Sequence, residues 1–142
     1  MKLDFKKDLH SDDSNVQTER GKGFTSKVVK GTLISAALIQ KYGSKMQVAI
    51  KLMNRKDDDY LYEVAIMSCL PPSPYIVQLI GYCENPKAIV MKYYPISLKL
   101  LLRSPEIGNN PMLRLKMGFD IANGMNVIHS HSILHLDLKP RK

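Results

Sequence analysis

Two glycines and a lysine in the first part of the chain could together bind phosphate groups. Gly21 and Gly23 flank a single residue, and a backbone without Cβ atoms can bring its N–H groups close to a phosphate. Lys51 ends the apolar run 48–50, a pattern that suits a buried strand holding one cation at a fixed place. The competing interpretations are a plain turn and a lysine that reaches solvent from a strand edge.

Three further residues carry groups for ion pairing and proton transfer. Glu63 follows the lysine strand, and its carboxylate could pair with Lys51 and hold it extended; a solvated surface Glu is the alternative. Asp137 and Lys139 stand two positions apart in His-Leu-Asp-Leu-Lys-Pro, residues 135–140. An Asp can accept a proton from a hydroxyl group, and a Lys can neutralise a phosphoryl group during its transfer.

Histidines near the same segment offer a different chemistry. His129, His131 and His135 are spaced by two and four residues, and Asp137 is near them in the sequence. Imidazole and carboxylate groups are common zinc ligands. A zinc site is therefore an alternative hypothesis for this part of the chain.

The elements that would position the first of these groups follow from local patterns. Glycine and proline positions separate expected strands, with a turn at Glu84-Asn85-Pro86; the strands are 27–30, 48–53, 75–82 and 88–93. The segment 33–42 fits either a strand or a short helix. A helix is expected over 60–70, since acidic residues precede it and Pro71 cannot continue it.

The rest of the chain is expected to be mainly helical. Leu98, Leu101 and Leu102 are spaced for a short helix. The segment 113–130 carries both an alternating and a helical pattern. Its length and the start signal Asn110-Pro111 favour a helix, with apolar residues on several sides that suggest burial among other elements.

Composition narrows the class of protein. The chain has 142 residues, which suggests one domain. Its net charge is +8, but no five basic residues follow one another in the sequence, so nucleic-acid binding is disfavoured. Cys69 and Cys83 are too few for a disulfide framework and are expected to be packed, reduced thiols. Without a signal-peptide pattern or a long apolar stretch, the expected location is intracellular, soluble and cytoplasmic, with no membrane span.

Four of these features occur in an order that resembles the signature set of eukaryotic-type protein kinases. They are the segment with Gly21 and Gly23, Val-Ala-Ile-Lys at 48–51, Glu63, and Asp-Leu-Lys-Pro at 137–140. The intervening segments 75–83, 88–94 and 120–130 are also similar to the family. The lysine at position 139 is more similar to the serine/threonine or tyrosine-kinase-like members than to true tyrosine kinases. The resemblance covers about residues 16–140.

The resemblance implies an α+β fold. A flexible lead-in over 1–15 would precede an N-lobe over 16–91, with a twisted antiparallel sheet and one helix that the family calls αC. The hinge and the first helices of a C-lobe would occupy 92–142 and end in the catalytic loop. The implied function is ATP-dependent phosphoryl transfer to Ser or Thr hydroxyls of proteins, and Tyr is the other acceptor of the family.

The resemblance also assigns roles within a nucleotide site. Lys51 would hold the α- and β-phosphates of ATP and Glu63 would orient it. Gly21, Gly23 and Val28 would cover the nucleotide, and Ala49 would touch the adenine ring. Met91 would be the gatekeeper, and Lys92 and Tyr93 would offer hinge backbone to adenine. Asp137 would be the catalytic base and Lys139 would meet the γ-phosphate.

The chain departs from the family pattern at several positions. Ser26 stands where the third loop glycine is expected, Leu136 replaces the catalytic-loop arginine, and Lys142 occupies the place of an asparagine that binds Mg²⁺. No Asp-Phe-Gly follows, so the Mg²⁺ ligands of the family are missing and the chain reads as truncated in the catalytic loop. Weak or absent turnover and exposed apolar surface over 112–130 are expected. A non-catalytic nucleotide-binding or regulatory module is the alternative.

Overall fold

The computed structural model describes residues 1–12, 26–42, 46–53 and 60–140. The chain divides into two compact units. The first comprises Met1–Cys69 and Gln78–Tyr93, and the second comprises Leu70–Val77 and Tyr94–Lys142. The separation into lobes at residues 91 and 92 stays a prediction.

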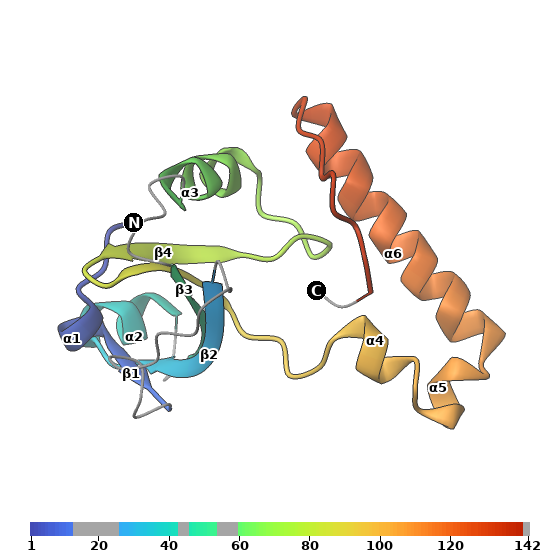
Figure 1. The fold of residues 1–142 in the computed structure, drawn as a ribbon, viewed down its shortest axis with the longest axis horizontal. Coiled ribbons are helices and arrows are strands. Elements are labelled where there is room, and N and C mark those ends of the chain that lie inside the picture. Colours follow the sequence, from blue (N-terminus) through green and yellow to red (C-terminus); the bar gives the residue numbers. More distant parts are fainter. Residues whose placement is uncertain (13–25, 43–45, 54–59, 141–142) are drawn as a thin grey trace. The chain divides into compact units, whose positions relative to one another are not determined.

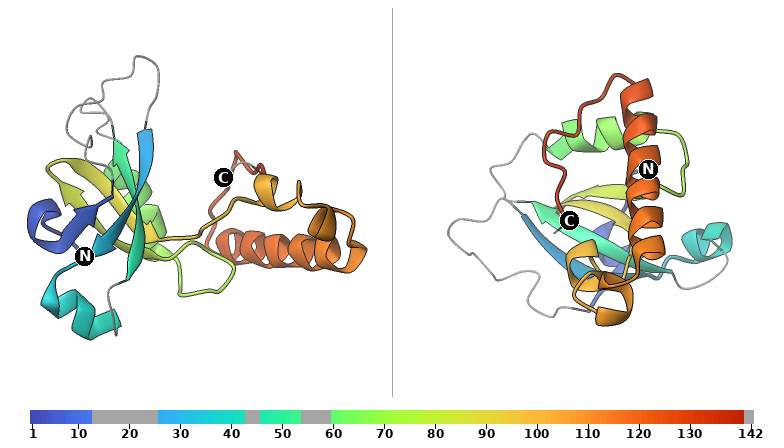
Figure 2. Two further views of the ribbon diagram at one scale, coloured as in Figure 1. Left: turned by 90° about the horizontal axis from the view of Figure 1, so that it is seen from below. Right: turned by 90° about the vertical axis from the view of Figure 1, so that its right-hand side faces the viewer.

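The first unit is built on a twisted five-stranded antiparallel sheet (Figures 1 and 2). Its strands are β1 (Leu9–Ser11), β2 (Ser26–Leu33), β3 (Gln47–Met53), β4 (Leu79–Glu84) and β5 (Lys87–Lys92), in the order β1-β2-β3-β5-β4. Three helices accompany the sheet: α1 (Phe5–Asp8), α2 (Ala36–Tyr42) and α3 (Tyr60–Cys69). The α+β architecture expected from the sequence is confirmed.

The sheet buries side chains on both of its faces because successive residues of a strand point to opposite sides. One face forms the larger core, in which Leu33, Val48, Ile50 and Val90 are fully buried. The other face packs against α3 through a smaller cluster centred on Ile89. Figure 1 shows α3 on the opposite side of the sheet from α1 and α2. Neighbouring residues of β3 therefore serve two different environments.

Residues 1–12 differ from the flexible lead-in expected for residues 1–15. The Leu3 N–H donates to the Tyr82 carbonyl at 2.8 Å, and the Tyr82 N–H donates to the Met1 carbonyl at 3.0 Å, so this segment lies along β4. Further on, β1 pairs with β2. Leu3 and Leu9 are buried in the larger core. Residues 1–12 are thus ordered because Leu3 and Leu9 are buried and because the backbone pairs with β4 at one side of the sheet and with β2 at the other.

The structure decides one assignment that the sequence left open and shortens one expected strand. The segment 33–42 ends β2 and then forms α2, whose Leu38 packs into the larger core. The strand expected over 75–82 begins only at Leu79 as β4. Before it, the Tyr75 N–H donates to the Ser73 hydroxyl at 3.2 Å and the Ile76 N–H donates to the Ser73 carbonyl at 3.4 Å. This local turn removes Tyr75 and Ile76 from the strand.

The second unit contains α4 (Leu98–Leu101), α5 (Pro105–Gly108) and the long helix α6 (Pro111–Ser130). The Asn110 side chain accepts hydrogen bonds from the N–H groups of Met112 and Leu113 at 3.1 Å each, as the start signal predicts. The helical interpretation of 113–130 is thus confirmed. Met112, Leu115 and Phe119 are each more than 60% exposed, so the expectation of exposed apolar surface on this helix is also confirmed.

Helix α6 approaches the segment 70–77 closely at Gly124. A Cβ atom there would lie 2.8 Å from the carbonyl oxygen of Tyr75, whereas a Cβ at Gly118 of the same helix would meet nothing within 4 Å. A glycine inside a helix costs about 1 kcal/mol relative to alanine. Close backbone packing is therefore the reason that position 124 suits glycine.

This difference gives a stability test. Gly118→Ala is expected to raise the free energy of unfolding by about 0.5–1 kcal/mol, because alanine favours the helix. Gly124→Ala is expected to lower it by about 1–2 kcal/mol, because the new methyl group collides with a backbone oxygen. Urea unfolding followed by circular dichroism measures both variants. Equal stabilisation by the two substitutions would contradict the contact with Tyr75.

Candidate functional site

The central feature of the first unit is an ion pair between β3 and α3. The Lys51 ammonium donates to both carboxylate oxygens of Glu63, at 2.7 and 2.6 Å. The side chains are 23% and 39% exposed, respectively, so neither is freely solvated. Hydrogen bonds between ionised groups are stronger than neutral ones. The sequence-based prediction that Glu63 pairs with Lys51 therefore agrees with the geometry.

The local fold explains why this lysine reaches the helix. Lys51 lies on the α3 face of β3, directly opposite Val28 of β2 and Ile89 of β5. Ile89 packs with Val64 of α3, which is the next residue after Glu63. Apolar packing between β5 and α3 thus fixes the helix, and the helix brings the Glu63 carboxylate to the lysine.

Other predicted nucleotide contacts lie on the same face of the sheet. Ala49 is two residues before Lys51 and pairs with Met91 of β5. Val28 is 60% exposed, while Ala49 and Met91 are half-buried. The structure therefore brings together Val28, Ala49, Lys51 and Met91 on one face. Gly21 and Gly23 lie outside the described residues.

The end of β5 differs in detail from the predicted hinge. The Lys92 N–H donates to the Gln78 carbonyl at 2.9 Å, so this N–H is already used within the protein. The Tyr93 ring lies beneath the Lys30 ammonium, with 5.2 Å between Nζ and the ring centroid. Sequence reasoning did not select Lys30, although its position two residues after Val28 places it on the same face of β2. Gln78 carried no sequence signal for its role.

The predicted catalytic residues lie in the second unit. Lys139 pairs with Asp137 at 2.8 Å, and the two side chains are 47% and 50% exposed. The Asp137 N–H donates to the His135 carbonyl at 2.7 Å and contacts the His135 ring Nδ1 at 3.3 Å. Leu136 has a φ of 57° and is 90% exposed. A leucine in this left-handed conformation is unusual, and the tight local hydrogen bonding accounts for the bend.

The zinc hypothesis finds no geometric support in the part of the chain that the structure describes. Within those residues, no group of three or more His, Cys, Asp or Glu side chains could hold a metal ion. The His131 ring instead lies 2.9 Å from the Val127 carbonyl and 3.2 Å from the Ser130 hydroxyl.

The two cysteines differ in environment. Cys83 is fully buried, and burial raises the pKa of its thiol to about 12, which keeps it neutral. Cys69, at the end of α3, is exposed. The expectation of a packed thiol is confirmed for Cys83 and is wrong for Cys69, because the buried face of α3 carries Tyr60 and Val64.

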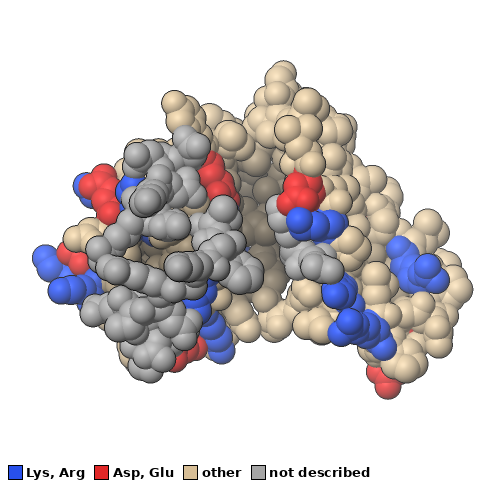
Figure 3. All heavy atoms as spheres, viewed as in Figure 1, with Lys and Arg blue, Asp and Glu red and all other residues tan. Residues whose placement is uncertain are grey.

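The surface shows separate charged groups. On the face drawn in Figure 3, Lys and Arg side chains occupy several distinct places, with Asp and Glu among them. One pair is Lys2 with Glu84, 2.6 Å apart. Among the described helices, none has the length and apolar character that crossing a bilayer requires.

Comparison with known proteins gives the family. Residues 15–142 match the family described as protein tyrosine and serine/threonine kinase. The chain is 35% identical to the probable serine/threonine-protein kinase drkC of Dictyostelium discoideum, across 98% of this chain and 19% of that protein. It is 32% identical to the tyrosine-protein kinase hopscotch of Drosophila melanogaster, across 89% of this chain and 11% of that protein.

A human relative gives a similar result. The cytoplasmic tyrosine-protein kinase BMX is 32% identical across 71% of this chain and 16% of its own length. The chain thus spans less than a quarter of the length of each of these relatives. With the match over residues 15–142 and the curled five-stranded sheet, the chain belongs to the protein tyrosine and serine/threonine kinase family.

Proposed function

We propose that this chain binds ATP on the α3 face of the sheet and supplies the nucleotide-binding part of a kinase that phosphorylates Ser or Thr hydroxyls of proteins. The observation that carries the proposal is the pairing of the Lys51 ammonium with both oxygens of Glu63. A cation held in place at a partly buried position is a suitable counterion for the α- and β-phosphates. A cytoplasmic location is part of the proposal, since ATP is the substrate.

The surrounding side chains suit the rest of the nucleotide. Ala49 has a small side chain and lies two residues from Lys51 on the same strand, which leaves room for a flat base beside the phosphate-binding lysine. Val28 is 60% exposed and offers apolar surface to that base. Met91 borders Ala49 in the next strand. Phosphates at Lys51 and the base over Ala49 would make use of all four side chains.

Magnesium is the other group that the family implies. When bound, Mg²⁺ neutralises charge on the phosphates. The described residues contain no group of three or more His, Cys, Asp or Glu that could hold a metal. These side chains do not by themselves form a Mg²⁺ site.

Asp137 and Lys139 are proposed to act in phosphoryl transfer. The Asp137 carboxylate would accept the proton of the attacking hydroxyl, and the Lys139 ammonium would neutralise charge on the transferred group. The two groups are half-exposed and 2.8 Å apart, so the Lys139 ammonium lies beside the carboxylate that would accept the proton. Lys139 in Asp-Leu-Lys-Pro supports serine or threonine as the acceptor.

Nucleotide binding without transfer is the second candidate. Leu136 stands where the family has an arginine, and its side chain is 90% exposed with a positive φ. Its apolar side chain cannot form the ion pair that the arginine makes with a phosphate group. A regulatory module of this kind would retain the Lys51–Glu63 pair and use it only to bind ATP.

A transfer assay separates the two candidates. ATP with labelled γ-phosphate is incubated with the chain and a protein substrate, and ATP affinity is measured in parallel by calorimetry. For a kinase, Asp137→Asn is expected to lower transfer by about 10²-fold or more and to leave ATP affinity nearly unchanged. The matched control is Asp120→Asn, whose carboxylate pairs with Lys116 on exposed α6.

The outcomes distinguish the proposals directly. ATP binding by the unchanged chain without any transfer would favour the second candidate. Absence of ATP binding would contradict both. Equal loss of transfer in Asp120→Asn and Asp137→Asn would contradict the role of Asp137 as the base.

A further inference from the structure

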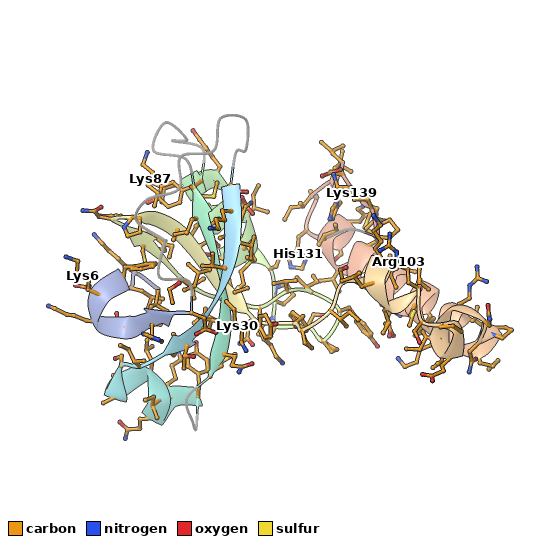
Figure 4. The ribbon with its side chains drawn as sticks, turned by 60° about the horizontal axis from the view of Figure 1, so that its bottom comes forward. Lys6, Lys30, Lys87, Arg103, His131 and Lys139 are labelled. Carbon is orange, nitrogen blue, oxygen red and sulfur yellow. The ribbon has the colours of Figure 1, made fainter. Side chains whose placement is uncertain are left out.

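The side chains of Lys30 and Tyr93 form a cation–aromatic pair on the face of the sheet that carries Lys51. The Lys30 ammonium lies 5.2 Å from the centroid of the Tyr93 ring. Lys30 belongs to β2 and is labelled in Figure 4, whereas Tyr93 follows directly after the end of β5. A cation over an aromatic ring is attracted by the negative face of that ring. The pair thus connects two segments that are not adjacent in the sheet.

The strand register places this pair beside Ala49. Lys30 lies opposite Ala49, and Ala49 lies opposite Met91, two residues before Tyr93. Ala49, which pairs with Lys30, and Lys51 are two residues apart on β3, which corresponds to about 6.5–7 Å along the strand. The Lys30–Tyr93 pair therefore stands at the Ala49 end of the face, while the Lys51–Glu63 pair stands at the other end.

The two lysines differ in their partners. Glu63 holds the Lys51 ammonium with two carboxylate oxygens. Among the residues that the structure describes, no carboxylate pairs with Lys30, whose ammonium contacts the aromatic ring. An ammonium carries three N–H donors, and a ring face leaves them available for an acceptor on a ligand. Lys30 is half-buried, which also limits its freedom to turn away.

We propose that Lys30 and Tyr93 recognise the nucleoside part of the nucleotide, with Lys30 donating a hydrogen bond to an acceptor on the base or ribose and Tyr93 holding Lys30 in place. The inference rests on the proposed function, because it takes the phosphates to lie at Lys51. It assigns selectivity for the nucleoside to one pair of residues and attraction for the phosphates to the other.

The experiment compares three ligands on the 142-residue chain. These are ATP, inorganic tripolyphosphate and adenosine, the last measured as a competitor of ATP. Lys30→Ala is expected to weaken ATP and adenosine by the same factor, about fivefold, and to leave tripolyphosphate unchanged. Lys30→Arg keeps a cation that stacks on the ring, and its ATP affinity is expected to stay within about twofold of the unchanged chain.

Two further variants complete the design. Lys41→Ala is the matched control, because the Lys41 ammonium also lies over a tyrosine ring, 5.3 Å from the centroid of Tyr42 in α2. It removes the same charge and is expected to change none of the three affinities. Tyr93→Leu frees Lys30 and is expected to weaken ATP and adenosine in the same direction as Lys30→Ala.

The results separate this inference from the proposed function. If Lys30→Ala weakens tripolyphosphate as much as ATP, Lys30 acts only as a general positive charge and the inference is wrong. If Lys30→Ala changes no affinity while Lys51→Met weakens ATP and tripolyphosphate, only the inference fails. If Lys51→Met leaves ATP binding intact, the proposed function fails.

Discussion

Replacement of Lys51 by methionine is expected to weaken ATP binding to this chain by about 10- to 100-fold. A hydrogen bond between charged groups contributes about 1.5–3 kcal/mol, and each 1.4 kcal/mol corresponds to about a tenfold change in affinity. The loss arises because the phosphates would face a side chain without charge. Calorimetry at constant ionic strength measures the effect directly, and the unfolding transition of the variant checks that it remains folded.

The control for this prediction is Lys6→Met. Lys6 lies in α1, is exposed and contributes the same charge to the chain, so only long-range attraction is lost. ATP affinity is expected to remain within about twofold, since salt screens exposed charges over about 10 Å. An equal loss of affinity in Lys6→Met and Lys51→Met would show that net charge, and not the Lys51–Glu63 pair, attracts the nucleotide.

Replacement of Ile50, the residue before Lys51 in β3, is expected to lower stability and to leave ATP affinity unchanged. Ile50 is fully buried in the larger core, so Ile50→Ala is expected to lower the free energy of unfolding by about 2–5 kcal/mol. Since the Ile50 side chain points away from the α3 face, ATP affinity of the molecules that remain folded is expected to be unchanged. Urea unfolding gives the stability, and calorimetry below the unfolding transition gives the affinity.

Leu61→Ala is the matched control for Ile50→Ala. It removes the same number of carbon atoms from a side chain that is 49% exposed on α3, and a change within about 0.5 kcal/mol is expected. A similar stability for Ile50→Ala and Leu61→Ala would contradict the assignment of Ile50 to the core. Loss of ATP affinity in folded Ile50→Ala would contradict the separation of the two faces of β3.

The sequence predicted the contact between Lys51 and Glu63 better than it predicted the packing around these two residues. The pairing of Lys51 with Glu63 followed from short motifs, because residue type and order limit which side chains can meet on a strand and the following helix. The buried face of α3 did not follow. The structure buries Tyr60 and Val64 and leaves Leu61 49% exposed. The apolar residues of α3 lie on several sides of the helix, so periodicity alone does not identify its buried face.

Contacts between distant parts of the chain were the least predictable. The Leu3 N–H donates to the Tyr82 carbonyl at the edge of the sheet, and charged residues flank Leu3 in the sequence. Its pairing depends on β4 offering free backbone groups at the edge of the sheet, which no local pattern reveals. The contact of Lys30 with Tyr93 likewise could not be predicted from local sequence. Alternation along β2 places Lys30 on the α3 face, but only the folded sheet brings Tyr93 to it.

The central claim is that the Lys51 amine meets the phosphates of a bound nucleotide. The most direct test uses ATP with a reactive acyl group on its γ-phosphate, which transfers that group to an amine lying against the phosphates. Mass spectrometry of peptides from the labelled chain then identifies the lysine. Labelling of Lys51 that is prevented by excess ATP is the expected result. If Lys51 stays unmodified, or is modified equally with and without excess ATP, the account is contradicted.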